Sequence, residues 1–174
     1  MCGYSYNGEY ISPTIVISGI CGDSLSFSLN NLGVLSIDGT GAMYDYMNIP
    51  APWSSYKESI RTVSLGEGIT YISPFAFYGC NRIYNYSYTG DNYQVINRSL
   101  YSADGKTLVC SALTTSGEFV MPDSLENFEA TAFLNASALT IVTNDKFTVS
   151  SSILYDSVGN IVMALPSYKS PSLT

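Results

Sequence analysis

Ile69-Thr-Tyr-Ile-Ser-Pro-Phe-Ala-Phe-Tyr-Gly-Cys-Asn-Arg-Ile83 is the stretch of sequence that decides the fold. Its Ala76-Phe77 pair returns later in the chain as Ala132-Phe133. A unit of this kind is too short to close its own core, so equivalent apolar residues of successive units must stack to form one. Around the pair, Val63, Leu65, Ile69, Ile72 and Ile83 are matched at the same spacing by Phe119, Met121, Leu125, Phe128 and Leu139.

A shorter period relates the start of this unit to the residues that follow it. Ile60, Val63 and Leu65 recur at one constant spacing as Ile83, Tyr86 and Tyr88. Side chains two residues apart in a strand share a face, so we expect Tyr86 and Tyr88 to lie in the core. The same argument predicts that Phe77 and Phe133 are equivalent buried rings and that Cys80 packs in the interior.

A second block also occurs twice and predicts inserted hairpins. Ser99-Leu-Tyr-Ser-Ala-Asp-Gly-Lys-Thr-Leu-Val109 is matched by Ile153-Leu-Tyr-Asp-Ser-Val-Gly-Asn-Ile-Val-Met163. Each text has a strand-like run on either side of a glycine-containing turn, which is typical of a β-hairpin. We expect these hairpins near residues 91–112 and 145–166.

The residues before the repeats favour a separate module. Leu25, Phe27 and Leu29 alternate with serines, and Val34–Ile37 follows after an Asn/Gly turn, which predicts a hairpin. The expected organisation is a lead-in or linker over 1–18, an N-terminal β-hairpin capping module over 19–59, and repeats with inserted hairpins over 60–174. Because Leu173 matches Phe119 at the spacing of the second block, we expect an array truncated at its C-terminus.

Composition supports β structure and disfavours several functions. The chain has 174 residues, of which 12% are charged and 15 are Tyr, a profile suited to pleated, half-buried surfaces. Its net charge is −7 with only seven Lys and Arg, so nucleic acid is not an expected partner. The sequence has no run of about 18 apolar residues and no signal-peptide pattern, so we expect no membrane insertion by this segment.

Residues that carry catalytic chemistry are scarce. The sequence has no His, which excludes His-dependent triads and His metal sites. Its four Cys form no C-x-x-C pair, so neither a zinc site nor a redox motif is predicted. We therefore predict no catalytic residue, cofactor or metal, and a protein that is not an enzyme.

Two motifs together resemble the leucine-rich repeat of the BspA type: residues 69–83, and the run Gly33-Val34-Leu35-Ser36-Ile37 with Gly39-Thr40-Gly41-Ala42-Met43. The resemblance implies a mainly β solenoid on a cell surface or outside the cell. It also implies a non-enzymatic role in adhesion or protein binding, with a protein ligand on host matrix or on a neighbouring cell surface. A carbohydrate-binding accessory module, with a glycan as partner, is the alternative that aromatic content and low charge suggest.

Residues between the core anchors would form a concave strip. Small uncharged polar side chains dominate it, and it is either a binding face or simply a solvated sheet surface. Its members are Thr62, Ser64, Asn85, Ser87, Thr89, Glu118, Val120, Ile141 and Thr143.

Overall fold

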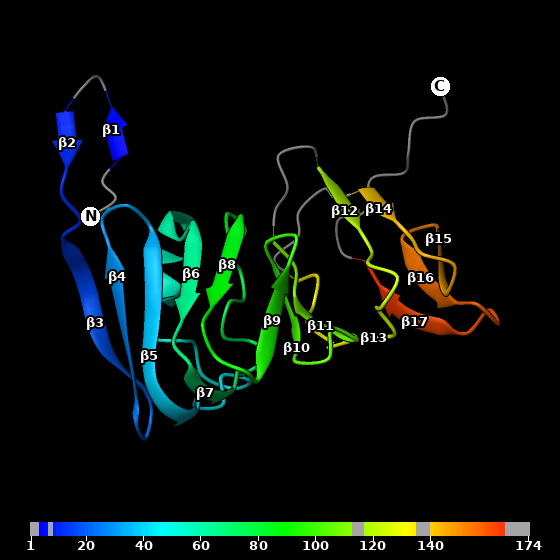
Figure 1. Cartoon of the computed structure of the whole chain (residues 1–174), viewed down its shortest axis with the longest axis horizontal. Helices are drawn as coiled ribbons and strands as arrows, with labels where there is room; N and C mark the ends of the chain where they lie inside the picture. Colours follow the sequence, from blue (N-terminus) through cyan, green and yellow to red (C-terminus); the bar gives the residue numbers. More distant parts are fainter. Residues whose placement is uncertain (1–3, 7–8, 113–116, 135–139, 166–174) are drawn as a thin grey trace.

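The structure is a computed structural model that describes residues 4–6, 9–112, 117–134 and 140–165. Across these ranges the chain is mainly β, with one 3₁₀ helix, η1 (Ser54–Ser59) (Figure 1). The first strands are β1 (Tyr4–Tyr6), β2 (Glu9–Ile11), β3 (Ile15–Gly22), β4 (Leu25–Asn30), β5 (Val34–Ala42), β6 (Thr62–Leu65), β7 (Gly68–Tyr71) and β8 (Asn85–Tyr88). They are followed by β9 (Tyr93–Ile96), β10 (Ser99–Ser102), β11 (Thr107–Cys110), β12 (Glu118–Val120), β13 (Asn127–Phe128), β14 (Thr140–Val142), β15 (Phe147–Ser150), β16 (Ile153–Asp156) and β17 (Ile161–Ala164).

The largest sheet joins the N-terminal module to the first repeats. Its strands lie in the order β3-β4-β5-β6-β8, with β7 paired to β5 at one end. The predicted β4–β5 hairpin is confirmed, and Gly33 closes its turn with a φ of 79°, a left-handed conformation that glycine adopts at low cost. β5, β6 and β8 then run parallel, with Leu35, Val63 and Tyr86 in register. The shorter sequence period is therefore the step from β6 to the parallel strand β8.

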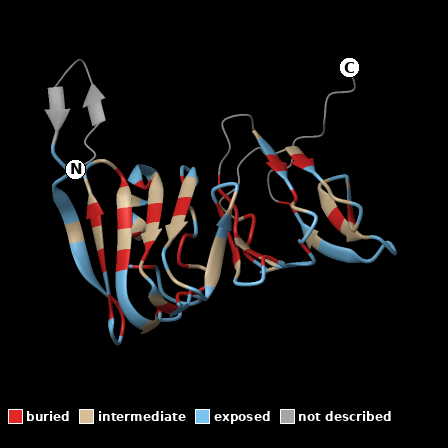
Figure 2. Cartoon of the chain, viewed as in Figure 1, coloured by how far each residue is buried: buried red, intermediate tan, exposed pale blue. Residues whose placement is uncertain are grey.

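One face of this sheet covers a continuous core. The alternating apolar residues of β4, β5, β6 and β8 point into it, and Figure 2 shows the resulting bands of buried residues. Trp53 lies at the centre, with its ring stacked on Phe77 and edge-on to Phe27. The prediction that Tyr86 is a core residue is confirmed, whereas Tyr88 is only half-buried because it lies at the end of β8.

Two modules of the same three-stranded design follow the sheet, and β13 adds a fourth strand, parallel to β11, to the first of them. β9-β10-β11 and β15-β16-β17 correspond strand for strand, at the spacing that the second repeated block predicts. The sequence predicts two-stranded hairpins, but each module has an additional strand before the glycine turn. A two-residue turn joins this additional strand to the next one, at Asn97-Arg98 between β9 and β10 and at Ser151-Ser152 between β15 and β16. All four turn residues have positive φ.

The expected solenoid is not what the described strands form. The Arg98 carbonyl accepts a hydrogen bond of 2.9 Å from the Tyr86 N–H, so the first module closes the outer side of β8. Within the described ranges, strands β12 and β14 pair only with each other, in a separate two-stranded parallel sheet. In Figure 1, β9–β11 stand between β8 and the β12–β14 pair. The inserted module thus interrupts the column of parallel strands that the sequence predicts.

A second core lies under the second repeat. Phe119 and Phe133 meet edge-on with centroids 5.2 Å apart, and Leu125 is fully buried beside them. Phe77 and Phe133 are both buried, as their equivalence predicts. The first inserted module contributes to both cores, with Leu100 in one and Tyr101 in the other.

The expected domain borders need one correction. The predicted limit between lead-in and module at residues 18 and 19 falls in the middle of β3, an edge strand that pairs along its length with β4. The expected truncation of the array concerns residues 166–174, which lie outside the described ranges.

Candidate functional site

The solvent side of the six-stranded sheet carries a row of serines. Cross-strand register places Ser18 beside Ser28, Ser28 beside Ser36, Ser36 beside Ser64, and Ser64 beside Ser87. These five residues, one from each of β3, β4, β5, β6 and β8, are the serine row. Strands of a sheet are about 4.8 Å apart, so the row presents hydroxyl groups at a regular spacing.

The period of the strands explains why this face is polar. Each serine of the row from β4 to β6 lies between two core residues of its own strand, as Ser36 does between Leu35 and Ile37. A neighbouring row contains Val34, Thr62 and Asn85 in register. We call the solvent side of β3, β4, β5, β6 and β8 the outer face. It offers hydrogen-bond donors and acceptors with no charged residue in either row.

Four residues of the predicted strip lie together on the outer face. Thr62 and Ser64 of β6 stand beside Asn85 and Ser87 of β8, and all four are partly exposed. Thr89 is exposed just past the end of β8. The structure therefore brings this half of the strip together as one surface.

The other half of the strip lies in a different sheet, and one of its members, Ile141, points into the core rather than to solvent. Glu118 and Val120 are exposed on β12. Ile141 is only 7% exposed, because it pairs with Phe119 and points into the second core. The predicted outward position of Ile141 is thus wrong, and a register error of one residue moves every side chain of a strand to the opposite face. Thr143 follows the end of β14 and is half-buried.

The cause of that error is visible in the sequence. The apolar anchor Ile83 precedes the core residue Tyr86 by three positions, but Leu139 precedes Ile141 by two. Ser18, Ser28 and Ser36 are not in the predicted strip, because the module predicted to be a cap before residue 60 is part of the same sheet. The alternation of serines with apolar residues along 24–29 was the signal that could have placed Ser28 there.

A second candidate site is an apolar cavity of about 460 Å³ beside Trp53. The Trp53 Nε1–H donates to the Ala76 carbonyl at 2.8 Å, and the Tyr46 hydroxyl donates to the Cys21 carbonyl at 3.2 Å, which fixes two of its walls. Met47 and Tyr78 are exposed at its rim. The cavity is lined by Tyr46, Met47, Asn48, Ile49, Pro50, Ala51, Trp53, Ser54, Phe75, Ala76, Tyr78, Cys80 and Leu134.

The buried thiols do not supply a nucleophile. Burial raises the pKa of the Cys21 thiol to about 11, and that of Cys80 and Cys110 to about 12. All three are therefore protonated at neutral pH, whereas thiol nucleophiles react as thiolates. Among the described residues no cluster of three or more His, Cys, Asp or Glu could hold a metal ion. In the same ranges no helix has the length and apolarity needed to cross a membrane.

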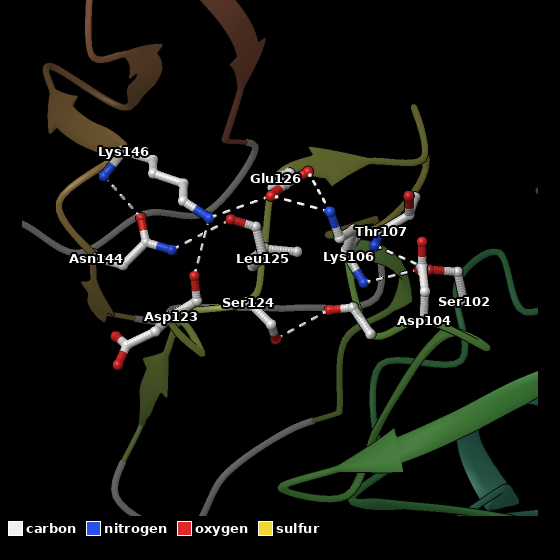
Figure 3. Close-up of polar contacts among 11 residues, drawn as sticks. Ser102, Asp104, Lys106, Thr107, Asp123, Ser124, Leu125, Glu126, Asn144 and Lys146 are labelled. Carbon is white, nitrogen blue, oxygen red and sulfur yellow. Dashed lines mark hydrogen bonds and ion pairs between the residues drawn. The ribbon is translucent and has the colours of Figure 1, made fainter.

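A charged network lies at the turn of the second repeat (Figure 3). Glu126 lies between Lys106 and Lys146, which approach its carboxylate at 3.2 and 3.5 Å. The Lys106 hydrogen bond and charge, with those of Lys146, hold the pKa of Glu126 below its usual range. Asn144 donates from its side chain to the Pro122 carbonyl at 2.9 Å. These contacts join Lys106 of the first inserted module, and Asn144 and Lys146 just before the second, to residues 122–126 of the second repeat. The network therefore has a structural role.

Comparisons with known proteins found one similar fold and no related sequence. No protein-family model matches the sequence, and the search of curated proteins found no match. The fold is similar to the crystal structure of a leucine-rich repeat protein from Eubacterium ventriosum, with a TM-score of 0.39 and 19% sequence identity. The match covers 74% of this chain and spans 60% of the length of that protein. At this level the likeness identifies neither a family nor a function.

Proposed function

We propose that the chain is a non-enzymatic protein-binding segment of a BspA-type leucine-rich-repeat protein that acts in adhesion at a cell surface. Its binding surface would be the outer face, and its ligand a protein of host matrix or of a neighbouring cell. The observation that carries the proposal is the serine row, a regular polar surface that spans five strands. The BspA-type assignment and the cell-surface location rest on the motifs of residues 33–43 and 69–83.

The chemistry of the outer face predicts how it binds. The serine row and the row of Val34, Thr62 and Asn85 contain hydroxyl, amide and methyl groups, and Asp38, in register with Ser26, is the one charged residue on these five strands. Electrostatic steering of a ligand is therefore weak. Association then proceeds at an ordinary, orientation-limited rate with little dependence on salt. Binding by one copy is weak, and the display of many copies on a surface strengthens it through avidity.

Surface plasmon resonance against a panel of matrix proteins tests this proposal. We expect weak binding that changes little between low and high salt and that becomes durable when the chain is multimerised. Ser64→Arg puts a long charged side chain at the centre of the outer face and should abolish binding. Ser150→Arg, at an exposed serine on β15 outside the outer face, is the matched control and should bind like the wild type. Equal binding by both variants would rule out the outer face.

A carbohydrate-binding module is the second candidate, and the cavity beside Trp53 favours it. Tyr78 is 63% exposed and lines the cavity, and its ring meets that of Phe75 edge-on with centroids 6.4 Å apart, so it offers an exposed aromatic surface beside the cavity. Sugar rings bind such surfaces through their apolar faces. A glycan array separates the candidates: glycan binding that is lost in Tyr78→Ala and kept in Ser64→Arg would favour the carbohydrate module.

A further inference from the structure

The first strand of the large sheet has an edge that no other described strand covers. β3 comprises eight residues, lies outermost in the sheet, and pairs only with β4 in the described part of the chain. Figure 1 shows the β1–β2 hairpin beyond the end of β3 rather than alongside it. The outer side of β3 therefore presents backbone N–H and C=O groups as a template for another strand.

The side chains of β3 do nothing to discourage such pairing. Ile15 is 62% exposed, Val16 49% and Ile20 70%. Proteins usually protect edge strands with lysines, prolines, inward charges or β-bulges. β3 contains none of the first three, and its register with β4 is irregular at Ile15/Ile17 and Ile20/Gly22 but regular between them. No charged residue occurs between Glu9 and Asp23. The edge is thus long, uncharged and rich in exposed β-branched residues.

We propose that β3 pairs antiparallel with β3 of a second copy of this chain, which joins two large sheets edge to edge. A second copy is the occupant because the edge carries no charge that would repel an identical edge. The chain has a net charge of −7, yet this stretch carries none, so two copies meet here without bringing their acidic groups together. A two-fold axis makes the contact closed, with the same residues contributed by both copies.

The register follows from the exposed side chains. With Ser18 opposite Ser18 of the second copy, Val16 faces Ile20 twice across the new pair. Cross-strand pairs of β-branched residues stabilise antiparallel strands, and here they cover four exposed side chains. Asp23 then lies opposite Pro13 rather than another carboxylate. In this register the serine row continues from one sheet into the other, which doubles the width of the outer face.

Sedimentation velocity on the full chain under reducing conditions tests the pairing. From roughly 1 to 100 µM, the wild type should shift from monomer to dimer. Ile20→Lys places a charge in the new contact and should weaken dimerisation about tenfold or more. The matched control is Ile161→Lys on β17, where an apolar side chain is similarly exposed on another outermost strand. A wild type that stays monomeric, or dimers lost in Ile161→Lys and kept in Ile20→Lys, would overturn the proposal.

Cross-linking tests the register without relying on Ile20→Lys. In a Cys2→Ser background, Ser18→Cys should yield a disulfide-linked dimer under mild oxidation, because residues directly opposite in an antiparallel pair bring their Cβ atoms to about 5 Å. Ser150→Cys, at an exposed site on β15, should stay monomeric under the same conditions. Equal cross-linking of the two variants would show collision between copies rather than a β3 pair.

Discussion

The indole nitrogen of Trp53 donates a hydrogen bond of 2.8 Å to the backbone carbonyl of Ala76. Trp53 comes from the proline-containing segment before η1, and Ala76 belongs to the repeated Ala-Phe pair. The same ring stacks on Phe77, with centroids 6.2 Å apart and an interplanar angle of 24°. One side chain thus fastens the N-terminal module to the first repeat, and the two share a single core.

Replacing Trp53 with Phe should destabilise the chain. Phenylalanine has no N–H, so the buried Ala76 carbonyl loses its donor, which costs about 1–3 kcal/mol in addition to the lost packing. Urea unfolding followed by far-UV circular dichroism measures the change, because Trp53 is the only tryptophan and the variant has no indole fluorescence. Tyr84→Phe, at an exposed ring, is the control and should stay within about 0.5 kcal/mol of the wild type. An unchanged midpoint in Trp53→Phe would contradict this account.

The parts of the fold that local patterns encode could be predicted from sequence. The β4–β5 hairpin follows from apolar alternation and an Asn/Gly turn, and the pairing of Val63 with Tyr86 follows from the constant spacing of the shorter period. Burial of Phe77 and Phe133 follows from their equivalent surroundings. Each of these depends on residues within one unit or on the distance between two equivalent units.

The parts that depend on distant contacts could not be predicted in this way. The Arg98 carbonyl accepts a hydrogen bond from the Tyr86 N–H, and this contact decides whether another strand can pair with the outer side of β8. The turn that positions Arg98 has positive φ without any glycine, so the usual sequence signal for it is missing. The sequence does not predict β3, because Ser18, Gly19 and Ile20 on an edge strand show no apolar alternation. The serine row could not be predicted for the same reason, because it includes residues of β3, β4 and β5.

A glycine in the second module's turn should stabilise the chain. Ser152 has a φ of 63°, a left-handed conformation that costs a non-glycine residue about 1 kcal/mol or more. Ser152→Gly removes that cost and keeps the backbone carbonyl, which accepts a hydrogen bond from the Leu165 N–H at 2.8 Å. We expect a gain of about 1 kcal/mol in thermal or urea unfolding. Ser150→Gly, in the preceding strand, should instead lower stability, and a loss in both variants would argue against the turn geometry.

The charged network at Glu126 should make stability depend on acid and salt. Its pKa is lowered in the folded chain, chiefly by the Lys106 hydrogen bond and charge. Its contribution is therefore present above the ordinary glutamate pKa of about 4.3 and is lost as the pH falls through the lower folded value. Glu126→Gln should unfold at a slightly lower temperature than the wild type at pH 7. The difference should vanish at about pH 2 and shrink in roughly 1 M salt, because these groups are exposed. A difference that persists at acid pH would exclude the ion pairs as its cause.

Asp156 should behave differently in salt. Its pKa is lowered mainly by hydrogen bonds from the Asn160 side chain and N–H, which lie 2.8 Å from its two oxygens. Stability from this carboxylate is likewise lost as the pH falls through its folded pKa, but hydrogen bonds are screened less than separated charges. Asp156→Ala should thus lower the unfolding temperature at pH 7 by a similar amount in low and high salt. A salt dependence equal to that of Glu126→Gln would contradict the distinction.

The two cores should unfold together because the first inserted module belongs to both. Leu100 packs in the core of Trp53, and its neighbour Tyr101 packs in the core of Phe133. Phe133→Ala should cost about 3–5 kcal/mol, as should Phe77→Ala. Although Trp53 lies in the other core, its fluorescence midpoint in urea should fall in Phe133→Ala together with the circular dichroism midpoint. Val158→Ala, at a side chain exposed in the second module, should move neither. A fluorescence midpoint that stays fixed while the circular dichroism midpoint falls would show that the module does not couple the cores.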